Sequence, residues 1–311
     1  MKPLAKVLIA LAFVGLALVP LAVAHQSVSS AKPGTAQPTD AAQAAKATAM
    51  PNTAGSLKIA VMGDFGTGTK QQYDTAAQMV NTYGAFPYEM VVLVGDNLYG
   101  SERPQDFQKK FEIPYKPLLD KGVKFYACLG NHDAREQKSY KLFNMGGETH
   151  YTLRSPHQNA RFFFFESTYP EPDQIAWLEK ELKSSTEDWK IVVFHHPLYS
   201  SGETHGSDTQ LRDRLEPLFV QYGVSLVLTG HDHFYERIKP QKGIQYFVTG
   251  SGGQLRVGNI DRGTGLTAAG FDTDNAFMIG EIVGDTFYFQ AISRLGKIVD
   301  SGSFLRRQKG Q

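Results

Sequence analysis

The sequence contains one cysteine among its 311 residues, Cys128, which lies within the apolar run 123–129. A single cysteine cannot form a disulfide within the chain, and it excludes a zinc ribbon built from several thiolates. A lone thiol in an apolar run is typical of core packing. A metal site in this protein would therefore draw on oxygen and imidazole ligands.

The chain also lacks a charge excess of either sign. Its 32 Lys and Arg residues balance 31 Asp and Glu residues. Removal of residues 1–24 would take away Lys2 and Lys6, leaving 30 basic against 31 acidic residues and a net charge of −1. The sequence has no basic stripe of the kind found in nucleic-acid-binding proteins. We therefore expect no nucleic-acid partner, and an anionic substrate would have to be attracted locally.

Long apolar runs are missing beyond the N-terminus. There, a short basic start precedes the apolar run Val7–Val19 and the residues Ala22–Ala24, a pattern typical of a secretory signal cleaved after Ala24. An uncleaved membrane anchor is the alternative, because Val7–Val23 approaches the length of a spanning helix. We favour the cleaved signal, which predicts a secreted or periplasmic protein with no stable membrane insertion after signal removal.

Composition divides the chain into three regions. After the predicted signal peptide at residues 1–24, residues 25–55 are rich in Ala, Ser, Thr, Gln and Pro and show no apolar periodicity, which predicts a flexible spacer. The overall hydrophobic content of 41% and charged content of 20% are ordinary for a globular protein. We expect one folded domain over residues 56–311.

Within this domain, apolar runs alternate with helical patterns up to Leu228 and then follow one another without helices. Helices are predicted at Tyr73–Tyr83, Pro104–Asp120, Arg135–Phe143, Asp173–Leu182 and Leu211–Tyr222. The alternation of strand and helix predicts parallel pairing. The later strands predict a second sheet stacked against the first, and they are Ile244–Val248, Ala276–Val283, Thr286–Ile292 and Lys297–Phe304. The expected fold class is α/β, with two stacked mixed β-sheets flanked by helices.

Five polar clusters each follow a predicted strand. They are Gly63–Gly66, Gly95–Tyr99, Gly130–Asp133, His195–Pro197 and Gly230–His233. Open α/β sheets bind their ligands beyond the carboxyl ends of parallel strands. A single Gly-Asp after a strand is most simply a turn, but five such clusters together predict one site.

The side chains of these clusters suit a pair of metal ions. Asp, Asn, His and Tyr offer oxygen and imidazole donors of the kind that bind Fe, Mn or Zn. Two such ions about 3.5–4 Å apart stabilise the entering and leaving oxygens of an in-line displacement at phosphorus. Ions this close need an anionic ligand between them, and we assign that role to Asp96.

In their order along the chain, the five clusters resemble the motifs of the calcineurin-like metallophosphoesterases. Tyr99, three residues after Asp96, narrows the resemblance to the purple acid phosphatases, and among these to the small, tartrate-resistant type. The resemblance runs from about Leu57 to the C-terminus. It implies a four-layer αββα sandwich. It also implies an acid phosphatase-like enzyme that hydrolyses small phosphate monoesters by attack of a hydroxide held by the metal ions.

The resemblance further implies which residues hold the two metal ions. The first ion, expected to be Fe(III), would be bound by Asp64, Tyr99 and His233, the second, a divalent Fe, Zn or Mn, by Asn131, His195 and His231, and Asp96 would bridge them. The chemistry of Tyr99 favours the same assignment, because a phenol with a pKa of about 10 binds as phenolate only beside a strongly charged ion. The alternative for Tyr99 is a loop residue that packs over Leu98.

Three residues near these ligands are predicted to act in catalysis. His132 would protonate the leaving alkoxide, with Asp133 orienting its ring and raising its pKa. The alternative for His132 is a hydrogen-bonding neighbour of the ligands. His205 matches a position near the leaving group in the enzymes that the chain resembles. His196, which follows His195, is expected to be a neighbour of the ligands or a surface residue.

Two other functions fit the same residues. One is a metal-dependent phosphodiesterase or nucleotidase, and the other is an exported protein that binds phosphate or metal without turnover. Tyr99 and the lack of an added nucleotide-binding domain favour the phosphatase over the first, and the full ligand set favours it over the second. The sequence indicates no particular oligomeric state.

Overall fold

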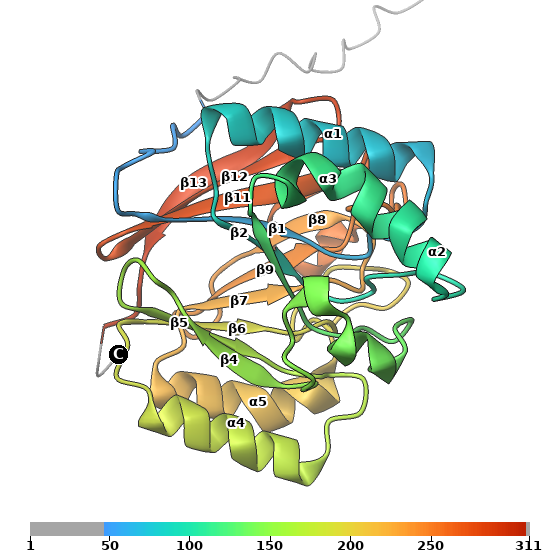
Figure 1. The fold of residues 1–311 in the computed structure, drawn as a ribbon. Coiled ribbons are helices and arrows are strands. Elements are labelled where there is room, and N and C mark those ends of the chain that lie inside the picture. Colours follow the sequence, from blue (N-terminus) through green and yellow to red (C-terminus); the bar gives the residue numbers. More distant parts are fainter. Residues whose placement is uncertain (1–46, 309–311) are drawn as a thin grey trace, which may run out of the picture. The chain divides into compact units, whose positions relative to one another are not determined.

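Two β-sheets pack face to face in the structure, a computed structural model that describes residues 47–308 (Figure 1). In spatial order, the first sheet consists of β13 (Ile298–Leu305), β12 (Thr286–Ser293), β11 (Ala276–Val283), β1 (Leu57–Met62), β2 (Met90–Leu93) and β3 (Lys124–Ala127). The second consists of β10 (Thr267–Phe271), β8 (Tyr235–Ile238), β9 (Gln245–Thr249), β7 (Leu226–Thr229), β6 (Trp189–Val193), β5 (Ala160–Phe164) and β4 (Tyr151–Arg154). Parallel runs, β1–β2–β3 and β5–β6–β7–β9, are flanked by antiparallel strands. These mixed sheets confirm the predicted α/β class.

Helices cover the outer face of each sheet (Figure 1). Helices α1 (Lys70–Ala85), α2 (Pro104–Phe107) and α3 (Ile113–Leu119) cover the first sheet, and α4 (Pro172–Ser184) and α5 (Thr209–Tyr222) cover the second. Strand β1 shows how the layers are joined. Its residues Ile59 and Val61 pack into the core between the sheets, whereas Ala60 and Met62 pack against the helices. The result is the four-layer αββα arrangement.

Helices α1 and α5 begin at side-chain caps. At the start of α5, the Asp208 carboxylate accepts a hydrogen bond from the Leu211 N–H at 2.8 Å. The same helix ends at Gly223, whose φ of 73° is most easily adopted by a residue without a side chain. Thr69 caps α1 in the same way as Asp208 caps α5.

The predicted helix Pro104–Asp120 contains a π-helical turn at Gln108–Glu112. Pro114 has no N–H and cannot donate to the Lys110 carbonyl. The side chain of Gln72 in α1 donates a hydrogen bond to that carbonyl instead, so the irregular turn ties α1 to the helix beside it. The predicted helix Arg135–Phe143 forms as two 3₁₀ turns, Arg135–Ser139 and Lys141–Phe143. A third 3₁₀ turn spans Arg262–Thr264.

The predicted second sheet exists, but three of the four C-terminal strands expected in it lie in the first sheet, and only Ile244–Val248, observed as β9, lies in the second. Strands β11, β12 and β13 extend the first sheet, with Leu57 of β1 opposite Ile282 of β11 in antiparallel register. The second sheet is built from β4 to β10. The strands β8 and β10 were not predicted, because four- and five-residue runs that contain charged residues or glycine show too little alternation. Tertiary packing, not the pattern of a strand, decided which sheet it joined.

Residues 47–55, the last part of the predicted spacer, are hydrogen-bonded to the first sheet. The buried Glu281 carboxylate accepts hydrogen bonds from the N–H groups of Asn52 and Thr53, both at 2.7 Å. The Thr48 N–H donates to the Ser301 hydroxyl at 2.8 Å. The predicted signal peptide and the rest of the spacer lie outside the described residues. Within residues 47–308, no helix has the length and apolar character needed to cross a membrane.

Candidate metal centre

The predicted site lies where parallel strands of both sheets end. Its clusters follow β1, β2 and β3 in the first sheet and β6 and β7 in the second. Backbone hydrogen bonds join these ends. The Gly63 N–H donates to the Thr249 carbonyl of the other sheet at 2.8 Å, and the Asp64 N–H donates to the Gly95 carbonyl at 3.0 Å. The five segments therefore meet at one edge of the two stacked sheets.

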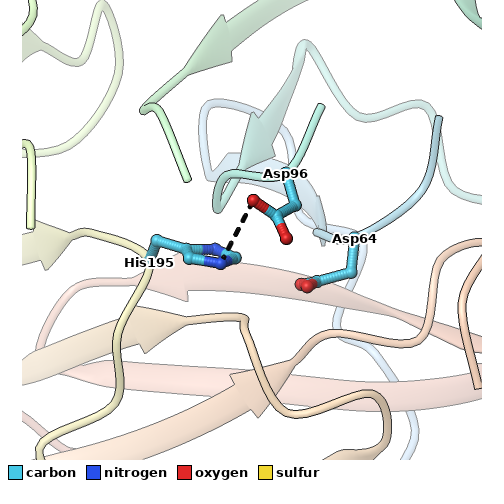
Figure 2. Close-up of side chains that lie close together, drawn as sticks. All are labelled: Asp64, Asp96 and His195. Atoms are coloured by element: carbon cyan, nitrogen blue, oxygen red, sulfur yellow. Dashed lines mark ion pairs between the residues drawn. The ribbon is translucent and has the colours of Figure 1, made fainter. Parts of the chain in front are cut away.

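Asp96 lies at the centre of the site and is 1% exposed. Its Oδ2 accepts a hydrogen bond from the Tyr99 hydroxyl at 2.9 Å, and its Oδ1 lies 3.4 Å from His195 Nε2. Figure 2 shows the carboxylates of Asp64 and Asp96 and the ring of His195 turned toward one another. One ligand atom from each of these three residues lies within 4.8 Å of the others, a spacing that suits a metal ion. The two oxygens of Asp96 thus face two different groups of side chains.

The first group consists of Asp64, Tyr99 and His233. The Tyr99 hydroxyl oxygen also lies 3.1 Å from Asp64 Oδ1 and 3.2 Å from His233 Nε2. His233 Nε2 lies 3.4 Å from the same Asp64 oxygen. The three residues predicted for the first ion are therefore in mutual contact, on the Oδ2 side of Asp96.

The second group consists of Asn131, His195 and His231. His195 Nε2 lies 3.2 Å from Asn131 Oδ1 and 3.2 Å from His231 Nδ1. The other ring nitrogen of His195, Nδ1, lies 2.9 Å from the Val94 carbonyl. A carbonyl can only accept, so Nδ1 donates this hydrogen bond, and Nε2 is the nitrogen that would offer its lone pair to a metal ion once it has lost its proton. All seven predicted ligand residues lie in one of these groups or, as Asp96, between them.

The backbone of the site adopts conformations that few side chains tolerate. Three of the predicted ligands have positive φ angles, 54° at Asp64, 48° at Asp96 and 70° at His231. Such angles are uncommon for residues other than glycine and are found most often at functional sites. Gly130 is required for a different reason, because a Cβ at this position would lie 2.2 Å from Asp96 Oδ1. The turns are therefore shaped around the carboxylates.

The two carboxylates strongly perturb the neighbouring titratable groups. Burial would lower the pKa of His195, but the charges of Asp96 and Asp64 raise it to about 9. Burial raises the pKa of Asp64. Burial acts in the same sense on Asp96, but the charge of His195 and the hydrogen bonds around it hold the pKa of that carboxyl below its ordinary range. Two buried carboxylates side by side require a cation, and the donors around them fit a metal ion in that role.

The same two carboxylates also act on Tyr99, whose phenol becomes negatively charged when it loses its proton. Burial, followed by the charges of Asp64 and Asp96, raises the pKa of the Tyr99 phenol far above its ordinary value. Its hydroxyl therefore stays protonated unless a strongly charged cation binds beside it.

Three further histidines surround the ligand residues. The ring of exposed His132 lies 4.9 Å from that of Tyr99, and the ring of exposed His205 lies 4.1 Å from that of His231. Half-buried His196 also packs on His231, at 4.4 Å between ring centres, and its Nδ1 lies 2.9 Å from the Ser167 hydroxyl. The structure therefore places solvent-exposed His132 and His205 beside predicted ligands, and it packs His196 against His231.

Asp133 has different partners from those predicted. Its carboxylate accepts hydrogen bonds from the N–H groups of Asn97, Leu98 and Gly130 at 2.9–3.0 Å. Among residues 47–308, no hydrogen bond or ion pair joins this carboxylate to the His132 ring. Asp133 therefore holds the turn that follows Asp96, because turn N–H groups outcompete a side chain that points toward solvent.

The sequence analysis assigned no role to two buried residues, Asn97 and Asp232, that hold the loops of the site. Buried Asn97 donates from Nδ2 to the Cys128 carbonyl at 2.9 Å. Buried Asp232 accepts a hydrogen bond from the Ser200 hydroxyl at 2.5 Å and so links the His205 loop to the turn between two predicted ligands. Both lie next to predicted ligands in the sequence, and nothing else in the sequence indicates their role.

Comparison with known proteins agrees with the family that the sequence motifs resemble. Residues 57–235 match the family model described as Calcineurin-like phosphoesterase. The tartrate-resistant acid phosphatase type 5 of Rattus norvegicus is 27% identical over 240 residues, which cover 64% of this chain and 73% of the rat protein. Purple acid phosphatase 17 of Arabidopsis thaliana is 32% identical over 244 residues, which cover 67% of this chain and 71% of the plant protein.

Solved structures share the fold. The purple acid phosphatase PPD1 from yellow lupin seeds matches with a TM-score of 0.64 and 18% identity, covering 84% of this chain and 55% of the lupin chain. GAP50, described as the anchor in the inner membrane complex of Plasmodium, matches with a TM-score of 0.71 and 22% identity, covering 82% of this chain and 90% of that chain. At these identities the structures show the architecture alone.

Proposed function

This chain belongs to the calcineurin-like phosphoesterase family, and on that premise we propose that it is an exported phosphatase that hydrolyses phosphate monoesters at a binuclear metal centre. The relatives named acid phosphatases support the choice of substrate class. The N-terminal pattern that predicts a signal peptide supports export.

The donor set supports two metal ions of different charge. Asp64, Tyr99 and His233 form a group with anionic oxygens, and such a group fits Fe(III). Asn131, His195 and His231 form a largely neutral group, which fits a divalent Fe, Zn or Mn. When bound, the ions would polarise the phosphoryl group and lower the pKa of water at the site.

One observation carries the proposal: the two oxygens of Asp96 face different groups. Oδ2 is 2.9 Å from the Tyr99 hydroxyl, and Oδ1 is 3.4 Å from His195 Nε2. A carboxylate shared in this way fits the ligand between two closely spaced ions. A site for one ion would not need donors on both sides of the same carboxylate.

Three residues outside the ligand set have separate roles in this proposal. Exposed His132 and His205 lie beside Tyr99 and His231, and from there an imidazole would donate a proton to the departing alkoxide oxygen. Asp133 does not orient His132 in this scheme. It keeps Asp96 in place through the N–H groups of the adjacent turn, as a positioning residue.

Metal analysis combined with two assays tests the proposal. Protein purified from an exported fraction should contain two metal ions per chain, absorb visible light through phenolate-to-iron charge transfer, and hydrolyse p-nitrophenyl phosphate. Substitution Tyr99→Phe should abolish the colour. Colourless protein that hydrolyses only bis(p-nitrophenyl) phosphate would identify a phosphodiesterase instead. Metal-loaded protein inactive on both compounds would indicate a role in binding without turnover.

A further inference from the structure

Lys110 is a buried lysine whose ammonium group is directed at the loop that carries Tyr99. Its side chain is 10% exposed, and its one ion pair among residues 47–308 is long, with 3.9 Å between Nζ and Asp106 Oδ1. The same Nζ donates much shorter hydrogen bonds, to the Tyr99 carbonyl at 2.6 Å and to the Ser101 carbonyl at 2.9 Å. Burial of an ammonium group costs free energy, which these hydrogen bonds offset.

The backbone of Tyr99 is held on both sides. Its N–H donates to the Gly66 carbonyl at 3.0 Å, and its carbonyl accepts from Lys110. Within residues 47–308, the Tyr99 carbonyl accepts a hydrogen bond from no other group. The next residue, Gly100, is exposed and has a φ of 78°, and a Cβ at this position would meet no atom within 4 Å. Packing therefore does not fix the chain where it leaves Tyr99, and Lys110 does.

The backbone of Lys110 is itself fixed, because it belongs to the π-helical turn Gln108–Glu112. Turns of this kind are rare and occur frequently at functional sites. The fully buried side chain of Gln72 in α1 holds the turn by donating from Nε2 to the Lys110 carbonyl. Its Oε1 accepts from the Gly68 N–H at 2.7 Å. Gln72 therefore joins the turn to the segment that follows Asp64.

The turn thus contacts the segments of two of the three residues predicted for the first ion, Asp64 and Tyr99. Within residues 47–308, neither Lys110 nor Gln72 makes a hydrogen bond to a residue of the second group. Only two rotatable bonds separate a tyrosine ring from its backbone, and the ring itself is rigid. The phenol oxygen therefore moves with the backbone, and a displacement of about 1 Å is enough to weaken a bond to an ion.

We propose that Lys110 is a positioning residue for the first metal ion. Its ammonium group fixes the backbone of Tyr99, so that the phenol oxygen can bind the ion together with Asp64 and His233. This inference rests on the proposed function and adds to it a residue that touches neither the substrate nor the ion. Lys110 would affect how tightly iron is held and the energy of the phenolate-to-iron charge transfer, because both depend on the placement of the phenol oxygen.

Absorption spectroscopy and metal binding on the full-length protein test the inference. Lys110→Met removes the donors and keeps most of the side-chain volume. It should shift the visible charge-transfer band, lower its intensity per bound iron, and weaken the affinity for Fe(III), measured by competition with a chelator, by about tenfold. Calorimetry with zinc should show a similar loss at one site. The other site should stay within about threefold, since the second group has no contact with Lys110.

Two further variants separate positioning from folding. Lys110→Gln keeps a polar group in the buried space, but its shorter side chain cannot reach both carbonyls, so it should shift the band as Lys110→Met does. It supplies the test if Lys110→Met does not fold. Lys110→Arg keeps the charge and can donate to both carbonyls, so it should recover part of the iron affinity.

Lys116→Met is the matched control. Lys116 lies in α3 with its side chain 68% exposed, and it forms an ion pair with Asp120 at 2.7 Å. Its substitution removes the same charge and one ion pair. The band and both metal affinities should stay as in the wild type, because an exposed ion pair contributes little and does not contact the Tyr99 loop.

An unshifted band with equal iron affinity in folded Lys110→Met would overturn the inference, as would an equal shift in Lys116→Met. A lower yield of folded protein with an unchanged band per bound iron would also overturn it, because Lys110 would then stabilise the fold alone. A colourless wild-type protein would overturn the proposed Fe(III) centre, and the zinc affinities would then decide the role of Lys110. A coloured wild-type protein that does not hydrolyse p-nitrophenyl phosphate would overturn the proposed function, while the band and the affinities would still decide the role of Lys110.

Discussion

Two carboxylates, Asp133 and Asp232, each hold one loop of the candidate site, and they do so to different degrees. Asp133 accepts hydrogen bonds on both oxygens, from the backbone N–H groups of Asn97, Leu98 and Gly130 at 2.9–3.0 Å. The side chains of Asn97 and Gln137 add further hydrogen bonds. The turn that follows the central carboxylate of the site is therefore fixed by several independent contacts.

Asp232 holds its loop through one oxygen. Its Oδ2 accepts hydrogen bonds from the Ser200 hydroxyl at 2.5 Å and the Gly206 N–H at 3.2 Å. Its Oδ1 is buried and has no partner among residues 47–308. The loop that carries His205 is therefore held by fewer contacts than the turn after Asp96.

The difference matches what each loop has to do. Metal ligands must keep a fixed geometry, because a shift of about 1 Å weakens coordination and catalysis. A loop at the opening must admit substrates and release products. We therefore expect substitutions that weaken the turn after Asp96 to lower stability and metal content. Substitutions that weaken the His205 loop should lower turnover.

Metal removal should have the largest effect on activity. Dialysis against a chelator should lower the hydrolysis of p-nitrophenyl phosphate by more than about a hundredfold, because the proposed ions activate both water and phosphate. Far-UV circular dichroism should change little, since Asp133 holds the ligand turn without metal. Activity should return on addition of iron together with a divalent metal. Full activity in metal-free protein would refute the binuclear mechanism.

Asp133→Ala should have the next largest effect. It leaves three turn N–H groups without an acceptor, and we expect the free energy of unfolding to fall by about 3 kcal/mol or more. Urea denaturation measures this loss, and metal analysis should show less bound metal. Asp120→Ala is a suitable control, because the Asp120 side chain is 59% exposed and its removal should cost less than about 1 kcal/mol.

Asp232→Asn should affect turnover more than stability. The amide keeps one oxygen for Ser200 and Gly206 but loses the charge that strengthens these hydrogen bonds, while the penalty for burying that charge also disappears. We expect kcat to fall about tenfold, the free energy of unfolding to change by less than about 1 kcal/mol, and metal content to stay constant. A clear loss of metal would mean that the two loops do not differ in the way described.

Ser200→Ala should have the smallest effect. It removes one hydroxyl donor and leaves the Gly206 N–H on the Asp232 carboxylate, so we expect kcat to fall only a few-fold and stability to fall by about 1 kcal/mol. Steady-state kinetics measured beside Ser184→Ala, an exposed position, would show whether the change is specific to the His205 loop. An effect larger than that of Asp232→Asn would contradict the order expected from the contacts.

Much of the fold was predictable because its signals are local. The apolar runs that became β1, β2, β6 and β7 are buried on both faces, and each is followed by a polar cluster. Because parallel strands present their carboxyl ends at one edge, the clusters could be predicted to meet. The sheet joined by β11 was not predictable from the strand itself, because its pattern fits a neighbour in either sheet.

Asp133 shows that residues adjacent in the sequence need not interact through their side chains. It follows His132 directly, and the sequence therefore suggested that the two side chains interact. In the structure, the Asp133 carboxylate accepts hydrogen bonds from the turn after Asp96 instead.

The sequence by itself determined the donor types, their place after buried strands and the glycines that allow close approach, because these depend on residue chemistry and local backbone preference. Only the tertiary structure decided which oxygen of Asp96 faces which group and which N–H groups Asp133 accepts from. These features depend on distances between segments that are far apart in the chain. Packing of the two sheets sets those distances, and no local pattern encodes them.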